Sequence, residues 1–283
     1  MSLLITDEKV KKQVQFYINN SLSCNYTDFV FPISNVNFIK RDSIHKIKNE
    51  YNFLVNNFNS KRGIFILYKN ENNENKQYIL FKNGELIETN INCNESYYED
   101  TILEVFYDND NSKIKICDVF CYKGIKLNVY NFTTRYNKVL EISNDCQYLD
   151  ITIRFYNQEL SENQEIYIIP EYNSFLTKFV HCYKWRNPEN VTFSLKLKNA
   201  EESAELYTSI FKNDVLFAKI NGNYANKIKN EYTKECIVNV SLKGGLLDLV
   251  SESKECIYPT SLRFIENILS FTQEDIKLCE LFM

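Results

Sequence analysis

Glycine and proline are scarce in this chain, with 6 Gly and 4 Pro among 283 residues. Flexible linkers and low-complexity segments are rich in these residues, so the sequence predicts a folded protein without long linkers. Basic residues are not in excess either, because 33 Lys and Arg stand against 37 Asp and Glu, for a formal charge of -4. That balance excludes bulk DNA binding and restricts any RNA contact to a local surface.

Long apolar runs are also missing. No run approaches the roughly 18 residues that cross a bilayer, and the N-terminal residues lack the basic start and apolar core of a secretion signal. The 9 cysteines are odd in number and scattered, mostly within apolar runs, as is typical of a reducing compartment. We therefore expect an intracellular protein of the nucleus or cytoplasm that is not secreted, with no membrane partner and with its cysteines packed as small hydrophobic residues.

Histidine occurs only at His45 and His181, which limits the catalytic and metal chemistry of the chain. A Cys-His or Ser-His nucleophile that uses His181 has no supporting motif. Cys117 and Cys121 are expected on one face of a strand, but two thiols without a nearby histidine or a second pair do not make a zinc site. These observations predict no Cys-His or Ser-His nucleophile and no zinc site.

The chain is instead rich in strand patterns. Helices are expected at residues 7–19, 42–49, 131–143 and 200–211, and two more close the chain, the last starting at a Thr272–Asp275 capping box. The predicted strands are FLVNNF, GIFILYK, YILFKNGELI, TILEVFY, KIKICDVFCY, YLDITIRFY, EIYIIP, VTFSLKLK, NDVLFAKI and CIVNVSLK. The apolar pattern of GIFILYK, TILEVFY and KIKICDVF predicts paired strands with one buried face. This order predicts an α+β fold with antiparallel sheet.

Residues 31–142 contain, in order, FPISNVNFIK, NSKRGIFILYK, TILEVFY and KICDVFCYKGIKL, followed by FTTRYNKV. The order, spacing and hydrophobic frame of these segments resemble the mRNA capping guanylyltransferases, a family of covalent nucleotidyltransferases. The resemblance covers this stretch well and the rest of the chain only in outline. It implies an antiparallel-sheet nucleotidyltransferase fold with a central cleft.

The same resemblance implies that the family's chemistry is lost. Guanylyltransferases attack GTP with a lysine and hold a divalent metal with carboxylates. The lysine position falls at Asn57, whose amide is not a nucleophile, and the acidic motif falls on residues 104–106, where Glu104 is the one carboxylate and is displaced. The aromatic residue that would stack on guanine falls at Cys117. From these losses we predict no catalytic residue, no metal site and no cofactor.

These losses are similar to those of the snurportin cap-binding domains, which are guanylyltransferase-like and bind a trimethylguanosine cap without a covalent adduct. The likeness is carried by residues 60–64, 101–107 and 117–124. It implies binding of a capped RNA or guanine nucleotide, or association with a protein partner in an RNA-processing complex.

Domain boundaries follow from the resemblance. We expect an N-terminal helical segment at residues 1–30, a guanylyltransferase-like domain at 31–245, and a C-terminal helical segment of the same domain at 246–283. Too few residues follow Lys243 for the OB-fold that active capping enzymes append. The fold is therefore expected without a C-terminal OB-fold.

Five residues are candidates for ligand binding. Trp185 is flanked by two basic residues and is expected in an exposed polar loop, where it suits stacking on a base, as does Phe38. Lys61 and Arg62 are candidates for phosphate contacts, and Asp118 for a hydrogen bond to the guanine edge. Each has a structural alternative: core packing for the aromatic residues, a solvated strand end for the two cations, and loop support for Asp118.

Three functions fit these observations. The first is a module that binds a 5′ cap or guanine nucleotide. The second is an active guanylyltransferase that uses Lys61 in a shifted register. The third is an architectural subunit of an RNA-processing or transcription assembly, in which side chains fill the old pocket.

Overall fold

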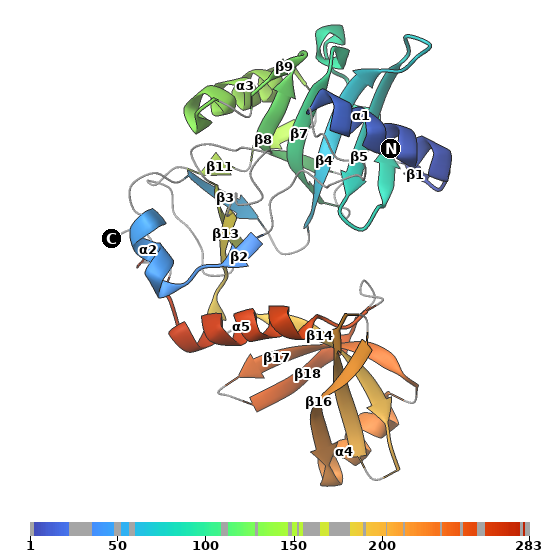
Figure 1. The fold of residues 1–283 in the computed structure, drawn as a ribbon, viewed down its shortest axis with the longest axis vertical. Helices are drawn as coiled ribbons and strands as arrows, with labels where there is room; N and C mark the ends of the chain where they lie inside the picture. Colours follow the sequence, from blue (N-terminus) through green and yellow to red (C-terminus); the bar gives the residue numbers. More distant parts are fainter. Residues whose placement is uncertain are drawn as a thin grey trace. The chain divides into compact units, whose positions relative to one another are not determined.

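The computed structural model is α+β, with mostly antiparallel sheets and a few helices (Figure 1). Two compact units form: unit 1 is Met1–Asn37, His45–Trp185 and Phe282–Met283, and unit 2 is Phe38–Ile44 and Arg186–Leu281. The domain boundaries expected from the sequence stay a prediction. The structure describes residues 3–22, 36–47, 52–56, 60–108, 113–127, 130–146, 149–151, 153–154, 165–169, 182–188, 191–201, 203–211, 213–232, 234–243, 246–253, 258–277 and 280.

The larger sheet of unit 1 has eight strands in the order β1-β6-β5-β4-β7-β8-β10, with β9 paired to β8. The pairings are antiparallel except that β10 runs parallel to β8. The strands are β1 (Leu3–Ile5), β4 (Ser60–Lys69), β5 (Asn75–Phe81), β6 (Leu86–Glu88), β7 (Thr101–Asp108), β8 (Lys113–Tyr122), β9 (Ile125–Lys126) and β10 (Leu149–Ile151).

Both faces of this sheet are buried at its centre. Residues 63–67 of β4 and 101–107 of β7 are buried without interruption. One face packs against α1 (Glu8–Ser21), and the other packs against α3 (Phe132–Asp145). The single buried face expected from the sequence is therefore wrong for these strands, whose near-continuous apolar runs are typical of strands covered on both sides.

Helices α1 and α3 lie where the sequence predicts them. The Asp7 carboxylate accepts a hydrogen bond from the Lys9 backbone N–H at 2.8 Å, and the Asn131 side chain accepts one from the Thr134 backbone N–H at 2.9 Å. Such N-cap bonds satisfy backbone donors that have no partner inside the helix. The 3-10 helix η1 (Glu95–Tyr98) also belongs to unit 1. Helix α2 (Arg41–Ile47) begins in residues assigned to unit 2 and ends in residues assigned to unit 1. Across the described parts of the chain, no helix is long and apolar enough to cross a membrane.

A second, five-stranded sheet has the order β11-β3-β12-β13-β2. Tyr167 of β12 packs against Phe106 of β7, with ring centroids 5.1 Å apart, so an aromatic contact joins the two sheets inside unit 1. The strands are β2 (Val36–Phe38), β3 (Asn52–Asn56), β11 (Ile153–Arg154), β12 (Glu165–Ile169) and β13 (Cys182–Trp185).

Unit 2 contains five antiparallel strands in the order β16-β15-β14-β17-β18. The fourth strand in the sequence lies beside the first, which is the Greek-key arrangement, and α4 (Gly222–Glu231) connects the third strand to the fourth. This is the strand connectivity of an OB-fold. The strands are β14 (Thr192–Asn199), β15 (Ser203–Ile210), β16 (Asn213–Asn221), β17 (Cys236–Lys243) and β18 (Leu246–Glu252).

Unit 2 corrects the expectation about the OB-fold. The sequence argument counted only residues after Lys243, but the five strands begin at Thr192 and end at Glu252. The premise that an OB-type arrangement would have to follow Lys243 is therefore wrong. Residues 246–252, expected in a helical segment, form β18, which pairs with β17 across a two-residue connection.

Two expected helices of this unit are also wrong. Residues 200–211 contain β15 instead of a helix, and β15 pairs with strands on both sides. Thr272 lies inside α5 (Leu262–Glu274), where its hydroxyl donates to the Leu269 carbonyl at 2.9 Å. Asp275 is the C-cap of α5, with a left-handed φ of 44°.

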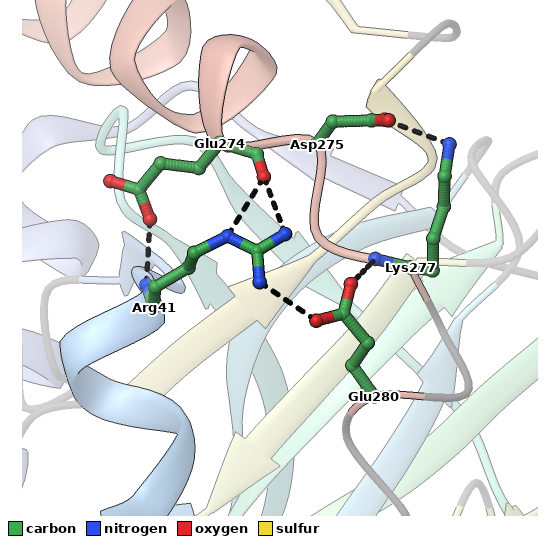
Figure 2. Close-up of polar contacts among 5 residues, drawn as sticks. All are labelled: Arg41, Glu274, Asp275, Lys277 and Glu280. Carbon is green, nitrogen blue, oxygen red and sulfur yellow. Dashed lines mark hydrogen bonds and ion pairs between the residues drawn. The ribbon is translucent and has the colours of Figure 1, made fainter.

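The start of α2 is attached to the end of α5 within unit 2 (Figure 2). Arg41 Nε and Nη2 donate to the Glu274 carbonyl at 3.2 and 3.0 Å, and Nη1 donates to the Glu280 carboxylate at 2.9 Å. The Arg41 backbone N–H donates to the Glu274 carboxylate at 2.6 Å. A cation at this position satisfies a carbonyl at the helix end and complements the helix dipole. Residues 38–44 therefore belong to unit 2.

Replacement of Arg41 with alanine is expected to lower the free energy of unfolding by about 1 kcal/mol, because hydrogen bonds at a helix end contribute this much while exposed ion pairs contribute little. Urea unfolding followed by circular dichroism measures the loss. Lys277→Ala is the matched control, since both cations are 55% exposed and Lys277 pairs with Asp275 at 2.8 Å. Equal losses in the two variants would show that the helix-end contacts of Arg41 add nothing.

Candidate functional site

The centre of the larger sheet holds two buried ion pairs. Arg62 of β4 pairs with Glu104 of β7, and their side chains are 13% and 3% exposed. Arg135 of α3 pairs with Asp118 of β8, and each side chain is 1% exposed. Arg135 Nε and Nη2 lie 2.9 and 3.1 Å from the two carboxylate oxygens of Asp118. Each carboxylate is therefore neutralised by a guanidinium in a place that water hardly reaches.

Strand register brings the two pairs together. Glu104 lies opposite Asp118 in the β7–β8 pairing, so two carboxylates sit on adjacent strands. Their repulsion is offset by the two guanidinium groups, and the four charges sum to zero. Burial raises the pKa of the Glu104 carboxyl above its ordinary value, whereas Arg62 acts in the opposite direction. We refer to Arg62, Glu104, Asp118 and Arg135 as the buried charge cluster.

Asp118 and Arg135 also form hydrogen bonds with the backbone. Asp118 Oδ1 also accepts the Val119 backbone N–H at 2.8 Å, and Arg135 Nη1 donates to the Tyr130 carbonyl at 2.7 Å. A satisfied polar network of this kind holds its members in one geometry. A guanine edge that bonded to Asp118, as expected from the sequence, would have to displace Arg135.

Arg135 is the member of the cluster that sequence reasoning missed. The signal for it in the sequence is the arginine of FTTRYNKV, the segment that closes the stretch resembling the guanylyltransferases. The Asn131 cap fixes the start of α3, and Arg135 follows one turn later. The helix therefore delivers a guanidinium to the buried carboxylate of β8.

Lys61 is the most accessible of the five predicted residues, with 34% of its side chain exposed, and it pairs with Glu85 at 3.4 Å. Next to it, the Arg62 guanidinium lies 5.4 Å from the centroid of the Tyr167 ring. The Lys184 ammonium lies 5.7 Å from the same centroid. Two cations thus contact one aromatic ring within the distance of a cation–π interaction.

Neither aromatic candidate is at the surface. Trp185 is 1% exposed, and the exposed loop expected for it is wrong because β13 extends to this residue, paired opposite Ile166. Phe38 is 7% exposed and packs against Phe264 and Phe271, with ring centroids 6.0 and 4.8 Å away. Trp185 belongs to unit 1 and Phe38 belongs to unit 2.

Of the other positions tied to the family's chemistry, Cys117 is fully buried in the core. Asn57 lies outside the described residues, and so does His181, the candidate base of a Cys-His or Ser-His nucleophile. Cys117 and Cys121 fall in different core clusters, not on one face as expected, because the β7–β8 register shifts twice and inserts extra residues into β8. No group of three His, Cys, Asp or Glu side chains gathers as metal ligands in the part of the chain that the structure describes.

Comparison with known proteins adds little to this geometry. No family model matches the chain, and no curated protein matches it. Among solved structures, the ligase domain of LigD from M. tuberculosis is similar over 79% of this chain and 94% of that one, with a TM-score of 0.37 and 7% identity. No family is assigned by a match at this level. The guanylyltransferase-like reading stays a prediction from the motifs.

A surface cavity of about 550 Å³ lies elsewhere in unit 1. Its lining is mainly polar and comes from the start of β5 and from the residues before and within η1. The five predicted residues are not among its lining residues, which are Asn75, Asn90, Ile91, Asn92, Cys93, Glu95 and Tyr98. No motif in the sequence marks this segment, so the pattern gave no reason to single it out.

Proposed function

We propose that this chain is a catalytically inactive guanylyltransferase-like protein that acts as an architectural subunit of an RNA-processing or transcription assembly. In this proposal the residues of the old polar site now stabilise the sheet. The buried charge cluster is the observation that supports it. Arg62, Glu104 and Asp118, which fall in the motifs of the resemblance, contact each other or Arg135 inside the core.

Energetics favour this function over ligand binding at the same residues. Removal of one partner from a buried ion pair costs about 3–5 kcal/mol, because the other charge stays buried and unpaired. A stacked base contributes about 1–3 kcal/mol. A ligand phosphate that took Arg62 from Glu104, or a guanine that took Asp118 from Arg135, would not recover the cost with one such contact.

A second function, non-covalent binding of a capped RNA end or guanine nucleotide, is favoured by the cations near Tyr167. Lys61, Arg62 and Lys184 come from two strands of unit 1, and Lys61 keeps a third of its side chain exposed. Phosphates would meet Lys61 at the surface, with Arg62 more deeply placed behind it. The stacking aromatic residue would have to be one other than Trp185 or Phe38, since both are buried.

The proposal is tested first by incubation with radiolabelled GTP, ATP or NAD and a divalent metal. The denatured protein is expected to stay unlabelled, because Asn57 replaces the nucleophile and Glu104 is held by Arg62. An active capping guanylyltransferase serves as the positive control. A labelled band that is lost in Lys61→Ala would instead establish the enzyme with a shifted register.

Calorimetric titration of the same preparation separates the two non-catalytic functions. For an architectural subunit, we expect no saturable heat with cap dinucleotide, GTP or uncapped RNA. Saturable binding that prefers the cap, and that Lys61→Ala weakens about tenfold or more, a loss of about 1.4 kcal/mol, would overturn the architectural proposal in favour of cap recognition.

A further inference from the structure

Two buried residues that line the surface cavity of unit 1 are held in place by one side chain. Gln77 of β5 is 6% exposed, and its amide bonds to the backbone of Ile91 in both directions. Its Nε2 donates to the Ile91 carbonyl at 2.6 Å, and its Oε1 accepts the Ile91 backbone N–H at 2.8 Å. Gln77 Nε2 also donates to the Tyr98 hydroxyl. The cavity residues Ile91 and Tyr98 are therefore fixed before any ligand arrives.

The Tyr98 hydroxyl keeps an unused donor beside the cavity. Its oxygen accepts a hydrogen bond from Gln77, but its own O–H has no acceptor among the described residues. Burial raises the pKa of Tyr98, so the phenol stays protonated at neutral pH. The side chain is 7% exposed, and a buried donor without a partner costs free energy. An oxygen atom of a ligand in the cavity would satisfy this donor.

Three asparagine side chains supply much of the remaining lining. Asn75 begins β5, and Asn90 and Asn92 lie between β6 and η1. All three are exposed, and none of their amides forms a hydrogen bond within the part of the chain that the structure describes. An asparagine amide offers two N–H donors and a carbonyl acceptor with two lone pairs. These amides are therefore available to a ligand.

Charge and polarity narrow the chemical class of that ligand. Glu95 is the one charged residue among the described lining residues, and Lys69 Nζ lies 3.3 Å from its carboxylate, so the cavity is close to neutral. A phosphate or carboxylate would meet no cation in this lining. An apolar ligand would meet Ile91 as the one aliphatic side chain and would leave the amides unpaired. A nucleobase stacks on an exposed ring, and the one aromatic lining residue, Tyr98, is buried.

We propose that this cavity binds a neutral carbohydrate, whose hydroxyl groups bond to the three asparagine amides and accept a hydrogen bond from Tyr98. Each sugar hydroxyl both donates and accepts, which matches the paired donors and acceptors of an amide. The volume of about 550 Å³ falls within the roughly 300–1,000 Å³ of small-molecule sites. This binding function goes beyond the architectural one and is independent of it, because none of the lining residues belongs to the buried charge cluster.

Nitrogen–proton NMR of the isotopically labelled full chain tests the proposal through the side-chain amide resonances of asparagine. The probes are maltotriose, mannotriose and triacetylchitotriose, with adenosine and guanosine as the alternative class. We expect the resonances of Asn90 and Asn92 to shift saturably with at least one saccharide, with a Kd of about 1 mM or lower. The resonance of Asn72 should stay in place. Asn72 is the matched control, because it is exposed in the turn before β5 and does not line the cavity.

Variants locate the binding. Tyr98→Phe removes the donor and keeps the ring, so it should weaken saccharide binding about two- to tenfold, as expected for one hydrogen bond. Asn92→Ala should weaken binding similarly, and Asn72→Ala should leave it unchanged. Urea unfolding reports whether each variant keeps its fold, and the exposed Asn92 decides the outcome if Tyr98→Phe does not. The proposal is overturned if no saccharide gives a saturable shift, if adenosine or guanosine gives it instead, or if Asn92→Ala binds as tightly as the unchanged chain.

Discussion

Replacement of Arg135 with alanine is expected to lower the free energy of unfolding by about 3–5 kcal/mol, because the Asp118 carboxylate would remain buried without its partner. Both side chains are 1% exposed, so water cannot take the place of the guanidinium. The loss is large against the roughly 5–15 kcal/mol that holds an ordinary domain folded. Urea unfolding followed by circular dichroism at constant pH measures it.

Two further variants make this result specific. Lys138→Ala removes another cation of α3, one that is 37% exposed and pairs with Glu141 at 2.8 Å, and its loss should stay below about 1 kcal/mol. The double variant Arg135→Met with Asp118→Asn removes both charges, so it should be more stable than Arg135→Ala alone. A loss below about 1 kcal/mol for Arg135→Ala would show that the pair does not hold the sheet.

Replacement of Arg62 with alanine is expected to lower the free energy of unfolding by about 3 kcal/mol near pH 8, and by less near pH 5. Burial raises the pKa of Glu104 and Arg62 opposes that shift, so without Arg62 the pKa in the folded state rises further. A group whose pKa is raised by folding favours the folded state while it is protonated, and this contribution is lost as pH rises through the folded value. The destabilisation therefore grows between these two pH values.

Glu104→Gln in the Arg62→Ala background is the control, because an amide does not titrate and the pH dependence should disappear. Equal losses at the two pH values would contradict the account. A different outcome bears on function: if Arg62→Ala leaves stability unchanged but abolishes binding of a cap dinucleotide, Arg62 is a ligand contact and the architectural proposal fails.

Strand positions could be predicted from the sequence because local pattern and tertiary pairing agree. GIFILYK and TILEVFY are apolar runs too short for most helices, and they form β4 and β7. The segment that forms β15 could not be predicted, because its Glu, Ala and Leu residues favour a helix locally, while pairing with β14 and β16 decides the outcome. Strand preference depends on neighbours that lie far away in the sequence.

The candidate site shows the same limit more strongly. Lys61, Arg62 and Asp118 are the types of residue that bind nucleotides, and their composition alone does not tell an open site from a filled one. The difference lies in partners from other elements, namely Glu104 across the sheet and Arg135 from α3. The register shifts between β7 and β8 add residues to β8 and move later side chains to the other face of the sheet. No local sequence pattern predicts these shifts.

The discontinuity of unit 2 affects how the protein is made. Residues 38–44 leave the ribosome before all of residues 45–185, yet the Glu274 and Glu280 groups that Arg41 contacts are translated near the end of residues 186–281. Domains generally fold as units in the order of synthesis. Here residues 38–44 of unit 2 are synthesised before residues 45–185 of unit 1, so they have no unit 2 partners to pack against until residues 186–281 follow. A recombinant fragment that spans only residues 186–281 would lack this segment and, with it, the contacts that Arg41 makes at the end of α5.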